Sequence, residues 1–170
     1  MSDAAPLLDR LDTTVCVVTT AEEGRPAGCI VTYVTAASIT AARPRLVVLT
    51  SHQNLTHELV ERSGVLAVHP VAREQGHWVR HFGLQSGRDV DKFADLEWEP
   101  GETGAPILDA AAGYLEGRVL ASLDCGDHTA RLVEPLRAVL RDAAAVPLRA
   151  SEVYASGVED ARSPSLFPWR

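Results

Sequence analysis

The stretch that decides the fold is residues 28–57, GCIVTYVTAASITAARPRLVVLTSHQNLTH. It holds two apolar segments, joined by a connection that carries Arg43 and Pro44, and the unbroken apolar run at 46–49 is typical of a buried strand. The second segment leads into polar residues at 50–54, and apolar residues at helical spacing follow. The stretch therefore predicts two strands that deliver a polar cluster to the start of a helix.

The polar cluster at the helix start has two interpretations. The first turn of a helix has N–H groups without a partner inside the helix, and these groups can bind an anion such as a phosphate. A side chain of the chain itself, here Asn54 or Thr56, can cap the same groups. Capping is common and phosphate sites are rare, so spacing alone favours the cap and leaves the anion site open.

The bulk composition is that of an ordinary globular chain. Of its 170 residues 46% are hydrophobic and 23% are charged, which predicts a single domain. The net charge of -7, without a basic cluster, argues against binding to nucleic acid. No apolar run approaches the roughly 20 residues that span a bilayer, so no membrane association is expected.

The ends of the chain and its cysteines bear on location and organisation. The N-terminus is too acidic for a signal peptide, and Cys16, Cys29 and Cys125 are too scattered for a disulfide framework or a zinc site. We therefore expect a cytoplasmic protein. We divide the chain into a domain at 1–150 and a tail or arm at 151–170, which is either disordered or docks onto a partner subunit.

Periodicity predicts the other elements. A strand at 15–20 is followed by a Gly- and Pro-containing turn at 22–26, so it should pair antiparallel with the strand that starts near residue 28. A second hairpin should join strands at 114–123 and 128–140. The remaining predictions are helices at 55–63 and 72–82, a strand at 65–69, a polar loop at 83–91 and a superficial turn at 100–106. This order predicts a mainly antiparallel β-barrel with helical insertions.

Few residue patterns suggest chemistry by themselves. His77 and His81 stand four residues apart on a predicted helix, but no third ligand has a recognisable spacing, so we expect no metal site. His128 follows a Gly-Asp turn at the start of a strand and could be structural or functional. Lys92 alone suggests a surface residue. No dinucleotide-binding GxGxxG and no P-loop motif occurs.

Five segments in register nevertheless resemble the flavin reductase-like, FMN-binding split-barrel family. They are VCVVTT with its hairpin, GCIVTYVTAASIT followed by PRLVVLT, NLTHELVERSGVLAVHPVA, FGLQSGRDVDKF, and YLEGRV with CGDHT. Together they cover about residues 13–133, most of the chain, in the family's own order. The resemblance implies an antiparallel split barrel that binds flavin.

The resemblance also implies a role for particular residues. The segment from Thr32 to Ser38 would lie along the flavin ring and ribityl chain, Ser51 to His57 would hold the phosphate, and the 82–93 region would close over the cofactor. His128 would lie on the nicotinamide side as the catalytic residue. The implied cofactor-binding residues are Thr32, Tyr33, Val34, Thr35, Ala37, Ser38, Ser51, Asn54, Thr56, His57, Phe82, Ser86, Lys92 and Phe93.

The implied function is an NAD(P)H-dependent flavin reductase that passes hydride from the nicotinamide to flavin N5. Such transfer needs no protein nucleophile, because the cofactor carries the chemistry. FMN is expected before FAD, with NADH or NADPH as co-substrate, a homodimer as the assembly, and a flavin-dependent monooxygenase as the partner that receives reduced flavin. A flavin carrier or a specialised biosynthetic flavoenzyme is the alternative, and a haem protein with His128 or His57 as axial ligand is a third.

The chain departs from the family pattern at several positions. Arg43 and Pro44 stand two residues later than the family's double proline, and Gly117 stands where cysteine is common. The run at 130–135 lacks the aromatic residue and the glycine that the family has before Glu134. Its proline, Pro135, should place an edge or a bulge there. These changes concern the nicotinamide side and motivate the carrier alternative.

Overall fold

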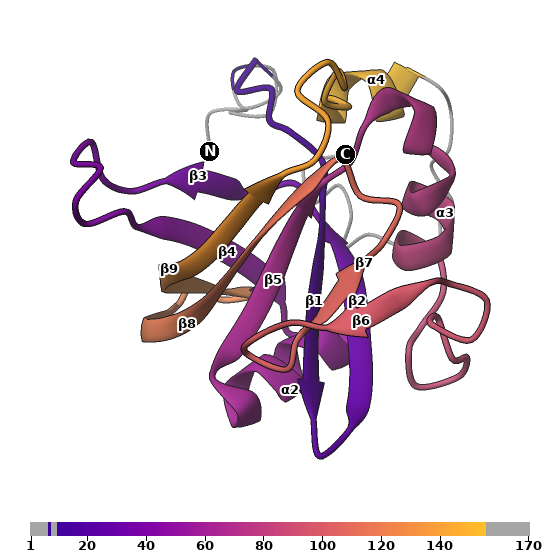
Figure 1. The fold of residues 1–170 in the computed structure, drawn as a ribbon, viewed down its shortest axis with the longest axis horizontal. Helices are drawn as coiled ribbons and strands as arrows, with labels where there is room; N and C mark the ends of the chain where they lie inside the picture. The colour runs from indigo at the N-terminus through magenta and orange to yellow at the C-terminus, as the bar shows by residue number, and fades with distance from the viewer. Residues whose placement is uncertain (1–6, 8–9, 156–170) are drawn as a thin grey trace.

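The computed structural model describes residue 7 and residues 10–155, and these form one large antiparallel sheet with short helices around it (Figure 1). The strand order is β2-β1-β5-β8-β9-β4-β3, and a separate ribbon pairs β6 with β7. The strands are β1 (Cys16–Glu22), β2 (Arg25–Val31), β3 (Val34–Ala36), β4 (Leu46–Ser51), β5 (Val65–Pro70), β6 (Trp98–Pro100), β7 (Pro106–Leu108), β8 (Gly113–Asp124) and β9 (His128–Leu140). The helices are α2 (Leu55–Ser63), the 3-10 turn η1 (Arg73–Gln75), α3 (His77–Gly83) and α4 (Ala150–Ala155). The predicted antiparallel arrangement is confirmed.

The first hairpin has the predicted pairing. β1 and β2 pair from Cys16 opposite Val31 to Glu22 opposite Arg25. The turn between them has positive φ at both central residues, 48° at Glu23 and 79° at Gly24. This turn geometry matches the twist of the two strands, and glycine takes it without strain.

The second hairpin carries the irregularity that its proline predicts. Pro135 lies opposite Gly117, and a register shift separates Glu116 from Gly117. β4 pairs with β9 only as far as Val133, so Pro135 has no partner on that side. A Cβ at Gly117 would lie 2.4 Å from the carbonyl oxygen of Glu134, so the close approach of the strands explains why glycine replaces a larger residue here.

The helices are confirmed in part. α2 ends where predicted, because Gly64 adopts the left-handed conformation (φ 68°) and its N–H bonds to the carbonyl of Val60. The predicted helix at 72–82 is wrong in its first half, since Gly76 separates η1 from α3. The superficial turn predicted at 100–106 is wrong at its end, because Ala105 is fully buried where β7 begins.

The core lies on both faces of the sheet. Along β1, Val15 and Val17 pack into one cluster with Trp78 and Phe82 of α3, while Cys16 and Val18 pack into another with Val48 and Leu66. A strand that is buried on both faces shows little alternation, which is why VCVVTT reads as continuously apolar. Figure 1 shows α3 and α4 together at one side of the sheet and α2 near the lower end of β1.

The ends of the chain add two facts. α4 places Ala150 and Val153 in the core beside Leu148. The predicted arm lies outside the described residues from residue 156 onward and stays a prediction. Within residues 10–155 no helix is both long enough and apolar enough to cross a membrane.

Candidate functional site

Three of the predicted site segments meet in a small hollow, here called the inner pocket. It is lined by the end of β2 with Thr32 and Tyr33, by Ser51 and Asn54, and by His128. Strand pairing brings them together, because β4 and β9 place Ser51 directly opposite His128. The carbonyl of Tyr33 also accepts a hydrogen bond from the N–H of Leu49 at 3.0 Å. Residues 77 positions apart therefore share one wall.

A second hollow, the middle pocket, adjoins the first through Asn54. Four predicted cofactor residues line it, namely Asn54, Thr56, Ser86 and Lys92. Ser86 comes from the loop after α3, and Asn54 and Thr56 come from the start of α2. The sequence-based prediction that these segments lie together agrees with this geometry.

The start of α2 is not closed by its own side chain. Asn54 is the N-cap residue, with extended backbone (φ -83°, ψ 135°), but its side chain makes no capping hydrogen bond. The capping interpretation is therefore wrong for Asn54, and the first-turn N–H groups of α2 lack the usual side-chain acceptor. An anion at this end would supply such an acceptor.

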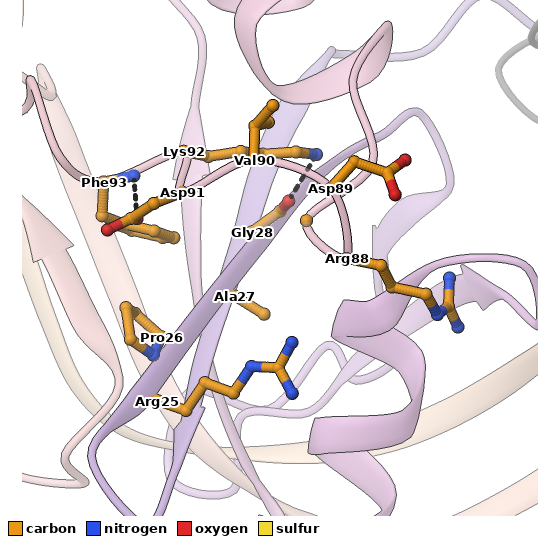
Figure 2. Close-up of a pocket in the computed structure, with 11 residues that line it drawn as sticks. Arg25, Pro26, Ala27, Gly28, Arg88, Asp89, Val90, Asp91, Lys92 and Phe93 are labelled. Carbon is orange, nitrogen blue, oxygen red and sulfur yellow. Dashed lines mark hydrogen bonds between the residues drawn. The ribbon is translucent and has the colours of Figure 1, made fainter.

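Lys92 is the only lysine in the chain, and the structure buries it at 6% exposure. Its ammonium group donates to the carbonyl of Phe82 at 2.7 Å. It also donates to the carbonyl of Gly28 at 3.1 Å (Figure 2). No carboxylate pairs with it within residues 10–155, and burial lowers the pKa of the Lys92 amine. The surface interpretation of Lys92 is wrong. A buried cation without a counterion, at the border of a hollow, is suited to an anionic ligand.

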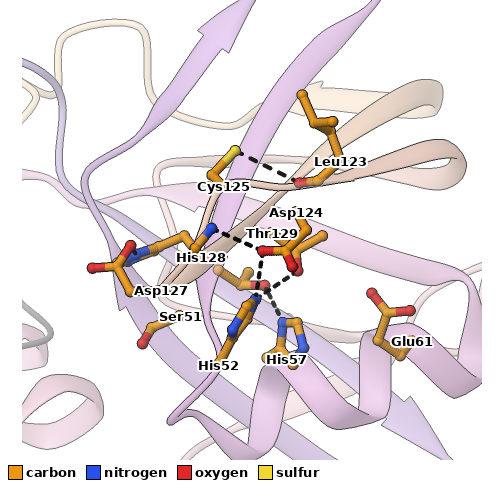
Figure 3. A network of polar contacts seen from close by, with 12 residues as sticks. Ser51, His52, His57, Glu61, Leu123, Asp124, Cys125, Asp127, His128 and Thr129 are labelled. Atoms are coloured by element: carbon orange, nitrogen blue, oxygen red, sulfur yellow. Dashed lines mark hydrogen bonds and ion pairs between the residues drawn. The ribbon is translucent and has the colours of Figure 1, made fainter.

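His128 is held by its neighbour in the chain. Its Nδ1 lies 2.8 Å from the Asp127 carboxylate, and this hydrogen bond lowers the pKa of Asp127 (Figure 3). With Nδ1–H donated to the carboxylate, Nε2 is the ring atom left for other partners. The edge of the His128 ring also faces Tyr33, with 6.1 Å between the ring centroids. Asp127 was expected only to form a turn, and its contact with His128 was missed.

A buried arginine, Arg131, three residues after His128 in β9, is not indicated by the sequence analysis. Arg131 is fully buried in β9 and forms an ion pair with Glu61 of α2 at 2.6 Å. It also donates to the hydroxyl of Thr50 and, at 3.1 Å, to Nδ1 of His57. Burial, together with this positive charge, lowers the pKa of His57. The two-residue repeat of a strand could have indicated this burial, because Thr129, Arg131 and Val133 share one face of β9 and all three are buried.

His52 and His57 lie side by side near Thr129, as Figure 3 shows. The rings of His52 and His57 lie with centroids 4.8 Å apart, and Nε2 of His52 lies 3.0 Å from the hydroxyl of Thr129. His57 therefore faces Arg131 and does not line the inner or the middle pocket. Within the described residues no three His, Cys, Asp or Glu side chains form a group able to hold a metal ion.

Other predicted cofactor residues lie apart from the two pockets. Phe82 is buried at 1% exposure in the core, where it packs edge-on against Phe93. Thr35 and Ala37 are exposed on β3 and the loop after it. Val34 pairs with Val48 in β4, and Ser38 accepts a hydrogen bond from the N–H of Arg45 at 2.9 Å. Neither pocket is lined by any of these residues.

Comparison with known proteins decides the family. The model of the flavin reductase like domain matches residues 8–154. This chain belongs to the flavin reductase-like domain family. The family resemblance and the split-barrel fold predicted from the sequence are thereby confirmed.

Three similar proteins have names that describe flavin reductases or their subunits. The chain is 30% identical to the FMN reductase (NADH) RutF of Stutzerimonas stutzeri over 82% of this chain and 79% of that protein. It is 30% identical to the flavin-dependent monooxygenase reductase subunit HsaB of Rhodococcus jostii over 72% of this chain and 60% of that protein. The NADH:FAD oxidoreductase SgcE6 of Streptomyces globisporus superposes with a TM-score of 0.75 at 26% identity, covering 86% of this chain and 87% of that one.

The chain covers less than two thirds of the length of several curated relatives. The matches span 41%, 20% and 60% of the length of three curated relatives.

Proposed function

We propose that this chain is an NAD(P)H-dependent flavin reductase that binds flavin across the inner and middle pockets. The observation that carries the proposal is the continuity of those two pockets between His128 and the buried Lys92, in a chain of the flavin reductase-like family. A flavin has an aromatic ring at one end and a phosphate at the other. The inner pocket is lined by apolar and hydroxyl side chains and would face the ring. The middle pocket contains Lys92 and would face the phosphate.

The residues present fit the phosphate. Lys92 supplies a positive charge that no carboxylate neutralises in the described part of the chain. The start of α2 supplies N–H groups that the Asn54 side chain does not cap. Asn54, Thr56 and Ser86 line the same hollow and add neutral hydrogen-bonding groups. Together they would hold a dianion without a large basic surface, in keeping with the net charge of -7.

The ring end is suited to positioning. Bound flavin supplies an acceptor for the hydride of a reduced nicotinamide. Thr32 and Tyr33, which directly follow β2, and Ser51 would border one side of the ring. His128 would orient the nicotinamide through Nε2, since Asp127 occupies Nδ1. Holding the two rings in contact is the main contribution of the protein to the rate.

The proposal includes a partner and an assembly. Reduced flavin would pass to a flavin-dependent monooxygenase, as the name of the HsaB relative suggests. A homodimer is supported by leucines exposed on the long β8–β9 hairpin, where Leu123 is 68% and Leu140 is 74% exposed. We place the protein in the cytoplasm, because Cys16, Cys29 and Cys125 are free thiols and reduced nicotinamide is a cytoplasmic co-substrate.

The second candidate is a flavin carrier that does not use free nicotinamide. It is favoured by the side chain of His128, only 10% of which is exposed, and by the buried Arg131 in the strand that departs from the family. In this case electrons would reach the flavin from a protein partner.

An anaerobic titration separates the two functions. The purified protein is mixed with FMN or with FAD, and the visible flavin band is followed as NADH and then NADPH are added. Rapid bleaching supports the reductase and names the donor. Flavin that binds but stays oxidised with both donors would contradict the reductase and favour the carrier. Failure to bind either flavin would contradict both.

A further inference from the structure

A third hollow, the outer pocket, continues from the middle pocket and is not used by the contacts proposed above. It lies between the start of β2 and the segment 87–93 (Figure 2). The outer and middle pockets share Ala27, Gly28, Gly87 and Lys92. The two hollows therefore form one groove, with Lys92 at the junction.

β2 runs beneath all three pockets in order. Residues 25–28 border the outer pocket, 27–29 the middle pocket, and 30–33 the inner pocket. At about 3.3 Å per residue, the strand from residue 25 to residue 32 spans roughly 23 Å. FMN ends at its phosphate, so an FMN whose phosphate lies beside Lys92 would leave the outer pocket empty.

The charges of the outer pocket suit a second phosphate. Arg25 is exposed on β2 and forms no ion pair within residues 10–155, so its guanidinium is available to a ligand. Arg88 is already engaged, because it donates to the carbonyl of Gln53 at 2.7 Å and pairs with Glu58. Lys92 faces the same groove as a buried cation. Arg25 and Lys92 are thus two cations of the outer pocket that no carboxylate neutralises within residues 10–155.

The remaining lining suits a nucleoside. Pro26 and the 41%-exposed Val90 provide apolar surface against which a base could pack. Asp89 and Asp91 are acceptors for ribose hydroxyls or an exocyclic amine, although Asp91 already accepts the N–H of Phe93 at 2.9 Å. The carboxylates of Asp89 and Asp91 would repel an inorganic phosphate, which brings only negative charge. A nucleotide also carries hydroxyl and amine groups that can donate hydrogen bonds to these carboxylates, so it fits this lining better.

We propose that the outer pocket binds the second phosphate and the adenosine of FAD, so that this chain prefers FAD to FMN. The inference rests on the proposed function, since it extends the same flavin site. The adenosine half of a nicotinamide dinucleotide has the same chemistry. That molecule must, however, reach the flavin beside His128, which lies in the inner pocket at the other end of the groove.

The test compares the two flavins in matched variants. Dissociation constants for FMN and FAD are measured by fluorescence quenching without nicotinamide, in the wild type, in Arg25→Ala and in Arg80→Ala. Arg80 is an exposed arginine of α3 outside the groove and serves as the control. We expect the wild type to bind FAD about tenfold more tightly than FMN, because one added charge-assisted contact has about this effect. Arg25→Ala should remove most of this difference and leave FMN binding unchanged.

Each other outcome has a definite meaning. Equal affinity of the wild type for FMN and FAD would overturn the inference, as would equal weakening of both flavins in Arg25→Ala. Unchanged FAD affinity together with a raised KM for NADH in Arg25→Ala would assign the outer pocket to the nicotinamide dinucleotide instead. Binding of neither flavin would overturn the proposed function itself, which distinguishes that failure from the others.

Discussion

The ammonium group of Lys92 lies 2.7 Å from the carbonyl oxygen of Phe82, and the same group bonds to Gly28 on the other side of the groove. A backbone carbonyl is a neutral acceptor, so the charge of Lys92 is fixed in place but not neutralised. The sole lysine of the chain is thus held in a fixed position in the lining of the middle pocket.

Lys92 offers a direct spectroscopic test. Protein labelled with ¹³C only at the lysine Cε should give one side-chain signal, because the chain contains one lysine. Burial lowers the pKa of this amine from its usual 10.5, and a bound phosphate should raise it again because the anion favours the ammonium form. We expect FMN or FAD to shift the titration of this signal to higher pH. A titration that flavin does not move would place the phosphate elsewhere.

Replacing the same residue should weaken flavin binding. In Lys92→Met we expect the FMN dissociation constant to rise about tenfold, the effect of one lost charge-assisted contact. The wild-type affinity should also decline as pH rises through the lowered pKa of Lys92, since only the ammonium form attracts the phosphate. Lys92→Met should show no such decline. Identical pH profiles in the two proteins would contradict this role.

Replacing Asn54 distinguishes a helix-capping role of this side chain from a ligand-binding role. A true N-cap contributes about 1 kcal/mol, but the Asn54 side chain makes no capping bond. Asn54→Ala should therefore leave the melting temperature of the flavin-free protein unchanged and should weaken FMN binding severalfold. Thermal denaturation and flavin titration check the two parts. A fall in melting temperature with unchanged FMN affinity would restore the capping interpretation.

Asp127 should act through His128. Asp127→Asn removes the carboxylate that accepts Nδ1–H, so the ring can take the other tautomer or turn away. We expect kcat/KM for the nicotinamide to fall about tenfold, in line with the loss of a charged hydrogen bond, while FMN affinity stays the same. Steady-state kinetics and flavin titration provide the readouts. Asp124→Asn, on the same turn, is the control.

His69 should make stability depend on pH. It is fully buried, its Nδ1 lies 3.3 Å from the carbonyl of Val17, and its Nε2 accepts the N–H of Leu108 at 3.3 Å. Burial lowers its pKa to about 4, below the 6.5 of the unfolded chain. The unfolded chain therefore binds more protons between these values, and the free energy of unfolding falls as pH drops from 6.5 to 4.

The size of that effect follows from the two pKa values. A difference of about 2.5 units corresponds to roughly 3 kcal/mol. His69→Gln keeps one donor and one acceptor but does not titrate, so urea denaturation of this variant should show a smaller loss over the same pH window. Parallel losses in the wild type and the variant would mean that other groups control acid stability.

Gly117 tests the bulge in the second hairpin. Gly117→Cys would introduce the residue common in the family, but its Cβ would lie 2.4 Å from the carbonyl oxygen of Glu134. We expect a loss of about 1–3 kcal/mol in the free energy of unfolding, the usual cost of overpacking. Gly76→Ala is the control, since a Cβ there meets its nearest atom at 3.4 Å. Equal stability of both variants would show that the strands separate easily at this point.

The sequence predicts the strands better than the site. Continuous apolar runs such as 15–20 and 46–49 mark buried strands, and Gly64 marks the end of α2, because these signals are local. Gly76 is a local signal too, but its effect inside the predicted helix at 72–82 depends on packing with the rest of the fold. Turn signals predict the partners within the two hairpins, whereas the pairing of β5 with β1 and β8 and of β4 with β9 joins distant segments and leaves no local signal.

The polar contacts were the least predictable. Whether Lys92 is exposed depends on the carbonyls of Gly28 and Phe82, which lie 64 and 10 residues away. The buried Arg131 likewise pairs with the carboxylate of Glu61, which lies 70 residues earlier on α2. Such pairings are long-range, and one sequence shows the charges without showing which of them meet.

The antiparallel ladder between β4 and β9 has a consequence for how ligands come and go. Ser51 and His128 are opposite members of one backbone ladder, so this wall cannot widen unless several main-chain hydrogen bonds break at once. The loop at 84–91, which lines the middle and outer pockets, belongs to no strand and is held by turns and by the side chain of Arg88. We therefore expect the speed of flavin exchange to be governed by the opening of that loop alone.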